Sequence, residues 1–280
     1  MQPLSVEAVA WRAIGGLEVM TWPAFDDLDV DVVMTTRHGG VSAGAYESLN
    51  LALHVGDDDD LVVENRRRAA QAIGAHLGDL VFCNQTHGRS VFVVTGSDRG
   101  RGTTSLTTAI DGVDAVVTAE AGPVLAMMVA DCVPIALCDP RAHVAGAVHA
   151  GWRGTVLRVA DAAVNAMTGL GASADDIVAA IGPAIHPDRY QVGPEVREAA
   201  AAGFAGEIDD LVRPDAGGPS GTYLFDLWKA NQRILVEAGV RPDHIVCAAV
   251  PSGGAGPFFS DRAVRPCGRN SILVRLRPPS

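Results

Sequence analysis

The chain has no excess of positive charge. Its 22 lysine and arginine residues are outnumbered by 33 aspartate and glutamate residues, which leaves a net charge of −11 at pH 7. Nucleic-acid-binding proteins usually present a basic face, and the aromatic residues on which bases stack make up only 5% of this chain. We therefore expect no nucleic acid among its partners.

Long apolar runs and a cysteine framework are missing as well. The longest apolar stretch, Pro123 to Cys138, is interrupted by Asp131 and is too short to cross a bilayer. The first residues carry no basic segment ahead of an apolar run, as a secretory signal would. The 5 cysteines lack the regular spacing of a disulfide framework. These absences predict a cytoplasmic protein without a membrane partner.

What is present is typical of a globular protein. Hydrophobic residues form 48% and charged residues 20% of the 280 residues, which is enough to build a sizeable core. Short runs rich in valine and isoleucine alternate with helical patterns, which indicates a mixed α and β fold. No segment has the composition of an interdomain linker, so we expect a single domain over residues 1–280.

The hydrophobic pattern also predicts individual elements. Strands are expected at Val30–Met34, Leu80–Cys83, Val91–Val94, Ala115–Thr118, Val124–Val129, Ile135–Cys138, Ala145–Val148, Ile177–Ile181, Ile245–Ala249 and Ile272–Leu276. Helices are expected at Thr155–Met167, Pro194–Ala202 and Asp226–Ala238. The acidic run from Asp57 to Asp60 precedes an arginine-rich segment and indicates the first turn of another helix.

Potential metal ligands stand at the ends of predicted strands. His87 follows the strand that ends at Cys83, Cys132 lies between two apolar runs, and His149 stands where a strand stops before a helix. Strand ends project side chains into the crevices where ligands bind. Two imidazoles and one thiolate, with an open fourth position, form the arrangement typical of catalytic zinc.

These residue types by themselves are also compatible with a purely structural role. A lone cysteine is often a small buried apolar residue, a lone histidine is often a core or surface residue, and the spacing matches no compact zinc signature. Asp131 favours a functional site instead, because it is polar inside an apolar run and an unpaired buried carboxylate is costly.

The chain resembles a known family in two adjacent segments. They read AMMVADCVPIALCDP and AGAVHAGWRGTVLRVA, and they resemble the core of the laccase-domain family, also called the multicopper polyphenol oxidoreductase-like family. Its members are regarded mainly as zinc-dependent purine nucleoside enzymes. The resemblance extends over nearly the whole chain, through the segments Thr36–Ser42, Tyr46–Leu51, Asn65-Arg66, Gln85–His87, Asp111–Ala115, Ile181–Ile185, Tyr190–Val196, Asp226-Leu227, Phe259–Arg262 and Gly268-Arg269.

The resemblance implies both a fold and a metal site. The expected fold is α+β, a single four-layer α/β/β/α domain with mixed sheets packed face to face. The expected metal ligands are His87, Cys132 and His149, and the expected cofactor is Zn²⁺, with copper as the alternative. Two departures from the family pattern lie near the C-terminus: Asp261 replaces a usual aromatic residue and Cys267 a usual threonine.

The resemblance also implies the reactions. They are phosphorolysis of adenosine, inosine, guanosine and methylthioadenosine, and hydrolytic deamination of adenosine, with purine nucleosides and inorganic phosphate as the partners. A zinc ion lowers the pKa of its water toward neutrality, and Asp131 or Asp114 are the carboxylates expected to move the proton. Arg37 and Arg153 are the expected phosphate contacts, and Gln85 is expected to contact the substrate.

Three alternatives stay open at this point. Cys132 with His149 could act as the nucleophile and base of a thiol hydrolase. The same ligands could bind copper for phenol oxidation, the activity behind the family's older name, although multicopper oxidases need more histidines than the 8 present. A metal-stabilised interaction domain without enzymatic activity is the third.

Overall fold

Two sheets packed face to face form the body of the molecule. The computed structural model describes residues 8–278. The first sheet has the order β1 (Ala10–Ile14), β2 (Leu17–Thr21), β3 (Val30–Thr35), β16 (Asn270–Leu276), β8 (Val124–Val129), β4 (Leu80–Asn84) and β6 (Ile110–Asp111). The second has the order β15 (Ile245–Cys247), β11 (Val178–Ile181), β9 (Val133–Asp139), β10 (Val144–Ala150), β7 (Ala115–Thr118) and β5 (Val91–Val93).

Both sheets are mixed. In the first sheet β4 runs parallel to β8 and to β6, and in the second β11 runs parallel to β15 and β5 parallel to β7. The remaining pairs of these two sheets are antiparallel. The central strands β8, β9 and β10 are buried along their whole length, because both faces of each sheet are covered.

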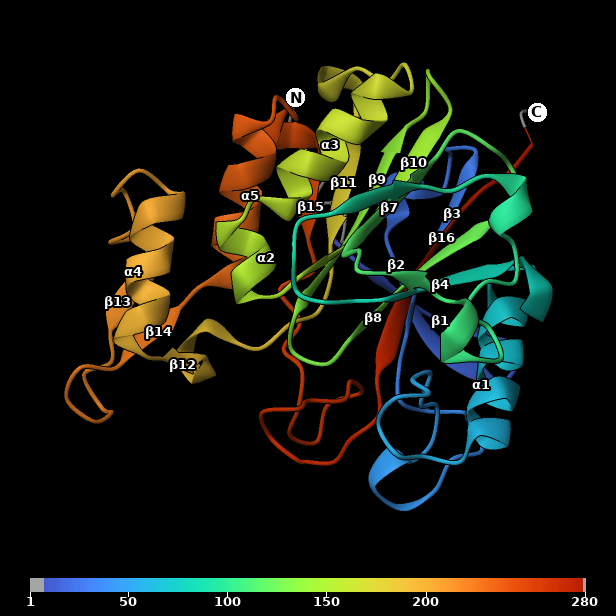
Figure 1. Cartoon of the computed structure of the whole chain (residues 1–280), viewed down its shortest axis with the longest axis horizontal. Helices are drawn as coiled ribbons and strands as arrows, with labels where there is room; N and C mark the ends of the chain where they lie inside the picture. The colour runs from blue at the N-terminus through green and yellow to red at the C-terminus, as the bar shows by residue number, and fades with distance from the viewer. Residues whose placement is uncertain (1–7, 279–280) are drawn as a thin grey trace.

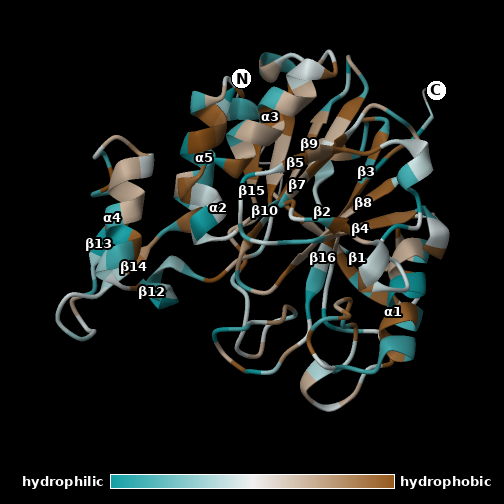
Figure 2. Ribbon diagram, in the orientation of Figure 1, coloured by the Kyte–Doolittle hydropathy of each residue, from teal (hydrophilic) through white to brown (hydrophobic). Residues whose placement is uncertain are grey.

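Helices cover the outer face of each sheet (Figure 1). The helices α2 (Trp152–Val156), α3 (Val159–Gly169) and α5 (Leu227–Glu237) lie on the second sheet, and α1 (Asp59–Ala72) lies on the first. One apolar cluster fills the space between the sheets, and one lies under the helices on each side. Figure 2 shows hydrophobic residues along the strands at the centre. The predicted α+β fold with four layers is confirmed.

A small third sheet stands beside the main body. It contains β12 (Gln191–Val192), β14 (Tyr223–Phe225) and β13 (Val212–Pro214), next to α4 (Pro194–Gly203). Figure 1 shows this unit in orange at the left of the view. The hydrophobic pattern predicts the helix but not these short strands, nor β1, β2 and β6. Unlike the equally short β5 and β15, they lie in no run rich in valine and isoleucine, which is the signal that the pattern uses.

The predicted helix Thr155–Met167 is wrong as one continuous element. Arg158 adopts φ +63° and ψ +47°, which is left-handed backbone, and it separates α2 from α3. The apolar pattern continues across the break since both helices pack on the same sheet, and periodicity therefore does not reveal it.

The acidic run at 57–60 lies at the start of a helix, as predicted. The carboxylate of Asp58 accepts hydrogen bonds from the backbone N–H groups of Asp60 and Leu61 and so caps α1. No helix within residues 8–278 is long and apolar enough to cross a membrane.

Candidate metal centre and its cavity

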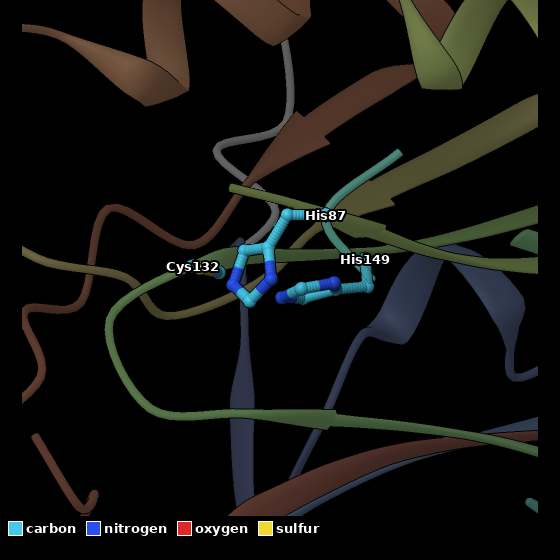
Figure 3. A group of neighbouring side chains, drawn as sticks. All are labelled: His87, Cys132 and His149. Atoms are coloured by element: carbon cyan, nitrogen blue, oxygen red, sulfur yellow. The ribbon is translucent and has the colours of Figure 1, made fainter. Parts of the chain in front are cut away.

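Three strand ends bring two histidines and a cysteine together. His87 lies in the loop after β4, Cys132 in the turn between β8 and β9, and His149 near the end of β10. One ligand atom from each residue lies within 4.8 Å of the other two. Figure 3 shows the two imidazole rings close together and roughly perpendicular, with their centroids 4.8 Å apart and an interplanar angle of 74°. We call these three residues the His–Cys–His group. It combines soft sulfur and imidazole nitrogen, the donors that zinc and copper accept.

Asp114 holds two parts of this group in place. Its carboxylate is fully buried, faces His149 Nδ1 at 2.8 Å, and accepts hydrogen bonds from the backbone N–H groups of His87 at 2.9 Å and Gly88 at 2.6 Å. Burial alone would raise the pKa of Asp114, but the bonds to His149 and to these N–H groups lower it to about 2. Since Nδ1 is engaged, Nε2 of His149 is the nitrogen left for a metal.

Two residues of the site have strained backbone. His87 has φ +61° and Asp131 has φ +86°, both in the left-handed region that side-chain-bearing residues avoid. Asp131 is held there by its own carboxylate, which accepts hydrogen bonds from Ser252 Oγ at 2.6 Å and from the backbone N–H of Arg262 at 2.7 Å. Such strain persists only where surrounding contacts impose it, and it concentrates at functional sites.

The space around the His–Cys–His group fits a bound ion. A Cβ atom added at Gly151 would lie 2.9 Å from Cys132 Sγ and 2.9 Å from His87 Cδ2, so glycine lets the backbone approach both side chains. Burial raises the pKa of Cys132, but the charge of His149 and contacts with both imidazoles outweigh burial and hold it below its ordinary value. The thiolate is the form of cysteine that binds metals.

A cavity of about 530 Å³ opens onto this group. Its lining includes Asn84, Gln85, Met128, Asp131, Ile185, Leu106 and His54, together with the ligand candidates His87, Cys132 and His149. Its walls carry two stacked pairs, in which Arg153 lies 4.3 Å from the ring centroid of Trp152 and Arg262 lies 5.1 Å from that of Tyr190. This volume suits a small-molecule ligand.

The residues predicted to bind substrate differ in their position and in their contacts. Arg153 lines the cavity, and among residues 8–278 it makes no ion pair. Gln85 also lines it, but its amide is engaged, since Nε2 donates to the Met128 carbonyl at 2.8 Å and Oε1 accepts from the Met128 N–H at 2.8 Å. Gln85 therefore fastens the loop of His87 to β8. Of the two predicted carboxylates, Asp131 lines the cavity and Asp114 lies behind His149.

The structure does not bring Arg37 to this cavity. Arg37 lines a separate space of about 170 Å³, donates from Nε to the Glu47 carbonyl at 3.0 Å, and stacks on Phe259. Arg37 stands just before Gly39 and Gly40, and two glycines would let this turn approach the crevice closely. Instead, Gly40 packs on its own loop, where an added Cβ would lie 2.0 Å from the Ser48 carbonyl oxygen.

Several lining residues are not identified by the sequence pattern. Tyr190 and Arg262 stand in segments that carry the family resemblance, which is the available signal, but the resemblance gives them no role. Arg269 lines the cavity too and stands in another such segment, Gly268-Arg269, again without an assigned role. Arg265 and His54 also line the cavity, and nothing in their local sequence marks them.

Comparisons with known proteins agree on one family. Residues 31–277 match the family model described as multi-copper polyphenol oxidoreductase laccase. The chain is 42% identical over 234 residues to purine nucleoside phosphorylase YlmD of Geobacillus stearothermophilus, covering 83% of this chain and 84% of that protein. It is 41% identical over 217 residues to adenosine deaminase RL5 of an unknown prokaryotic organism, covering 78% and 82%.

A solved structure shares the fold. The crystal structure of YlmD from Geobacillus stearothermophilus superposes with a TM-score of 0.86 at 37% identity and covers 97% of this chain and 100% of that one.

Proposed function

Because the chain belongs to the multi-copper polyphenol oxidoreductase laccase family, we propose that it is a purine nucleoside enzyme that works at the His–Cys–His group. Its reactions are phosphorolysis of adenosine, inosine, guanosine and methylthioadenosine, and hydrolytic deamination of adenosine. The convergence of His87, Cys132 and His149 within 4.8 Å beside the cavity carries this proposal. The names of the two relatives, a purine nucleoside phosphorylase and an adenosine deaminase, support it.

Zinc is the metal that this donor set favours. Three protein ligands with an open position toward a cavity are the arrangement of catalytic zinc, whereas copper sites of the electron-transfer type usually add an axial methionine. When bound, the metal would supply Lewis-acid chemistry and lower the pKa of a water molecule. Metal analysis of the protein purified without added metal tests this choice, since one zinc per chain supports it and one copper contradicts it.

The two carboxylates take separate roles. Asp131 lines the cavity next to Cys132, and we assign it the proton on the substrate. Its two oxygens already accept from Ser252 Oγ and the Arg262 N–H, so the proton would be held by a remaining lone pair. Asp114 lies outside the cavity lining and faces Nδ1 of His149, so it orients the ligands rather than meeting the substrate.

Arg153 is the residue we assign to phosphate. Its guanidinium stacks on Trp152 in the cavity wall and forms no ion pair within the described part of the chain, so its donors are available to an oxyanion. Arg153 lies within α2, a helix of only 5 residues, so the N-terminus of this helix adds little to the attraction for an anion. Phosphate binding therefore depends mainly on the side chain.

The experiment that tests this function uses three nucleosides. The purified protein is incubated with adenosine, inosine and methylthioadenosine, with and without inorganic phosphate, while free base, hypoxanthine and sugar phosphate are measured. Phosphate-dependent release of base supports phosphorolysis, and conversion of adenosine to inosine without phosphate supports deamination. Absence of both from metal-loaded protein would contradict the proposal.

Thiol chemistry is the second candidate, because the Cys132 pKa is lowered beside His149. In that case Cys132 would attack the substrate and His149 would act as the base. Full activity after complete chelation of metal would favour this candidate over the metal-dependent enzyme.

A further inference from the structure

A cluster of three charged side chains, separate from the His–Cys–His group, lines the same cavity. The carboxylate of Asp261 lies between two guanidinium groups: Oδ1 accepts from Arg269 Nη2 at 2.9 Å, and Oδ2 accepts from Arg265 Nε at 2.6 Å. All three residues line the cavity, and all come from the loop that precedes β16. We call them the rim cluster.

The two arginines differ in how firmly they are held. Arg269 is only 20% exposed, and its Nη1 donates to the carbonyls of Cys267 at 3.0 Å and Gly268 at 3.1 Å. Arg265 is 74% exposed and makes its side-chain bonds to Asp261. The cluster therefore consists of a fixed cation and a movable cation that share one carboxylate.

The cavity as a whole is rich in positive charge. Its lining contains the arginines Arg153, Arg262, Arg265 and Arg269. It contains two aspartates, and one of them, Asp131, lies next to Cys132. Asp261 is therefore the carboxylate that limits the positive charge of the rim. Without it, two forked guanidinium groups would stand close together, an arrangement that binds phosphate groups well.

We propose that Asp261 is a specificity-determining residue, which makes the cavity select uncharged nucleosides over nucleoside 5′-monophosphates. This inference rests on the proposed function. In this proposal, a nucleoside whose reacting atoms lie at the His–Cys–His group extends its 5′ end along the same cavity to the rim cluster. A 5′-phosphate would meet the Asp261 carboxylate and would have to displace it from Arg265 and Arg269 before it could bind them.

The test is a set of substitutions that change the charge of the rim cluster in the metal-loaded full-length protein. The probes are inosine and inosine 5′-monophosphate, with binding measured by calorimetry and turnover of inosine measured in parallel. In Asp261→Asn the ratio of monophosphate affinity to inosine affinity should rise about tenfold at low salt, the lower end for one gained charge-assisted contact. In Arg265→Met, an exposed change that leaves Asp261 paired with Arg269, the same ratio should fall.

A matched control distinguishes rim charge from a general loss of negative charge. Asp243 forms an exposed bidentate pair with Arg241 outside the cavity, so Asp243→Asn should leave the ratio unchanged. High salt should reduce the effect of Asp261→Asn, because charges near the surface are screened, whereas a change in loop shape would persist.

Other results would overturn the inference. They are an unchanged ratio in Asp261→Asn, equal loss of both ligands, or an effect that salt does not reduce. If Asp261→Asn does not fold, the ratio of monophosphate affinity to inosine affinity in Arg265→Met decides. A ratio that stays unchanged or rises in that variant also overturns the inference. Failure of the wild-type protein to turn over inosine contradicts the proposed function instead. The titrations with inosine 5′-monophosphate test the role of Asp261 by binding alone, so they show whether this inference fails as well.

Discussion

The His–Cys–His group and the rim cluster lie in the same cavity but are built in opposite ways. The group stands at strand ends and is held by the buried Asp114, while the rim cluster belongs to one loop and is held by partly exposed ion pairs. Buried hydrogen-bonded charges are costly to disrupt, and exposed ion pairs contribute little and are screened by salt. In the roles proposed above, the chemistry therefore depends on the rigid part, and selection of the ligand depends on the adjustable part.

The largest effect should come from removing a member of the rigid part. In His149→Ala we expect loss of bound metal together with loss of activity. The loss of activity should exceed roughly 100-fold, the largest loss usual when only a residue that supports a metal ligand is removed. Metal content and turnover are measured on the same sample. A variant that keeps all its metal and loses only turnover would show that His149 acts as a base, and thiol chemistry would then gain.

A smaller effect is expected when only the support is changed. Asp114→Asn keeps the shape but removes the charge that faces His149 Nδ1 and the N–H groups of His87 and Gly88. Metal affinity should fall about 10- to 100-fold. Competition with a chelator measures it.

The control for this substitution is Asp176→Asn, whose carboxylate pairs with Arg141 outside the cavity and which should leave metal affinity unchanged. Wild-type metal affinity in Asp114→Asn would show that the ligand geometry does not depend on this carboxylate.

The wall of the cavity should respond in substrate binding rather than in metal binding. Arg153→Met should raise the KM for phosphate about tenfold, as expected for one lost charge-assisted contact, while deamination of adenosine stays near wild type. Arg37→Met is a matched control, because Arg37 lies outside the cavity, and it should leave the phosphate KM unchanged. Equal loss of both reactions in a folded Arg153→Met protein would assign Arg153 to the nucleoside or to the fold.

The smallest expected effect compares the His–Cys–His group with the exposed arginine of the cavity wall, Arg153, in a single protein. Raising the salt concentration from about 0.05 to 0.5 M should weaken phosphate binding about threefold, because it shortens the range of exposed charges. Metal content after dialysis in the same buffers should not change, since the His–Cys–His group is held by short-range bonds. Equal sensitivity of both quantities would mean that the contrast between the regions is wrong.

Most of the fold could be predicted from the sequence because burial leaves a local pattern. Strands such as Val124–Val129 have the predicted bounds, and α5 begins after Asp226, the residue expected to cap it. The break at Arg158 could not be predicted, because a single left-handed residue does not interrupt the apolar pattern on either side. The short strands β12, β13 and β14 have only 2 or 3 residues each, and β12 pairs with the distant β14 through Gln191 and Leu224, which no local window contains.

The sequence by itself determined which chemistry the cavity can support. The residue types of His87, Cys132 and His149, placed after strands, limit that chemistry to imidazole and thiolate donors, and their role as metal ligands stays a prediction. Only the tertiary structure decided which polar residues meet them. It places Arg37 outside the cavity, turns the Gln85 amide toward Met128, puts Asp114 behind His149 and assembles Asp261, Arg265 and Arg269 at the rim. The reason is physical: burial of a side chain follows a period of a few residues, whereas the partner of a polar side chain depends on loop paths that bring together positions far apart in the chain.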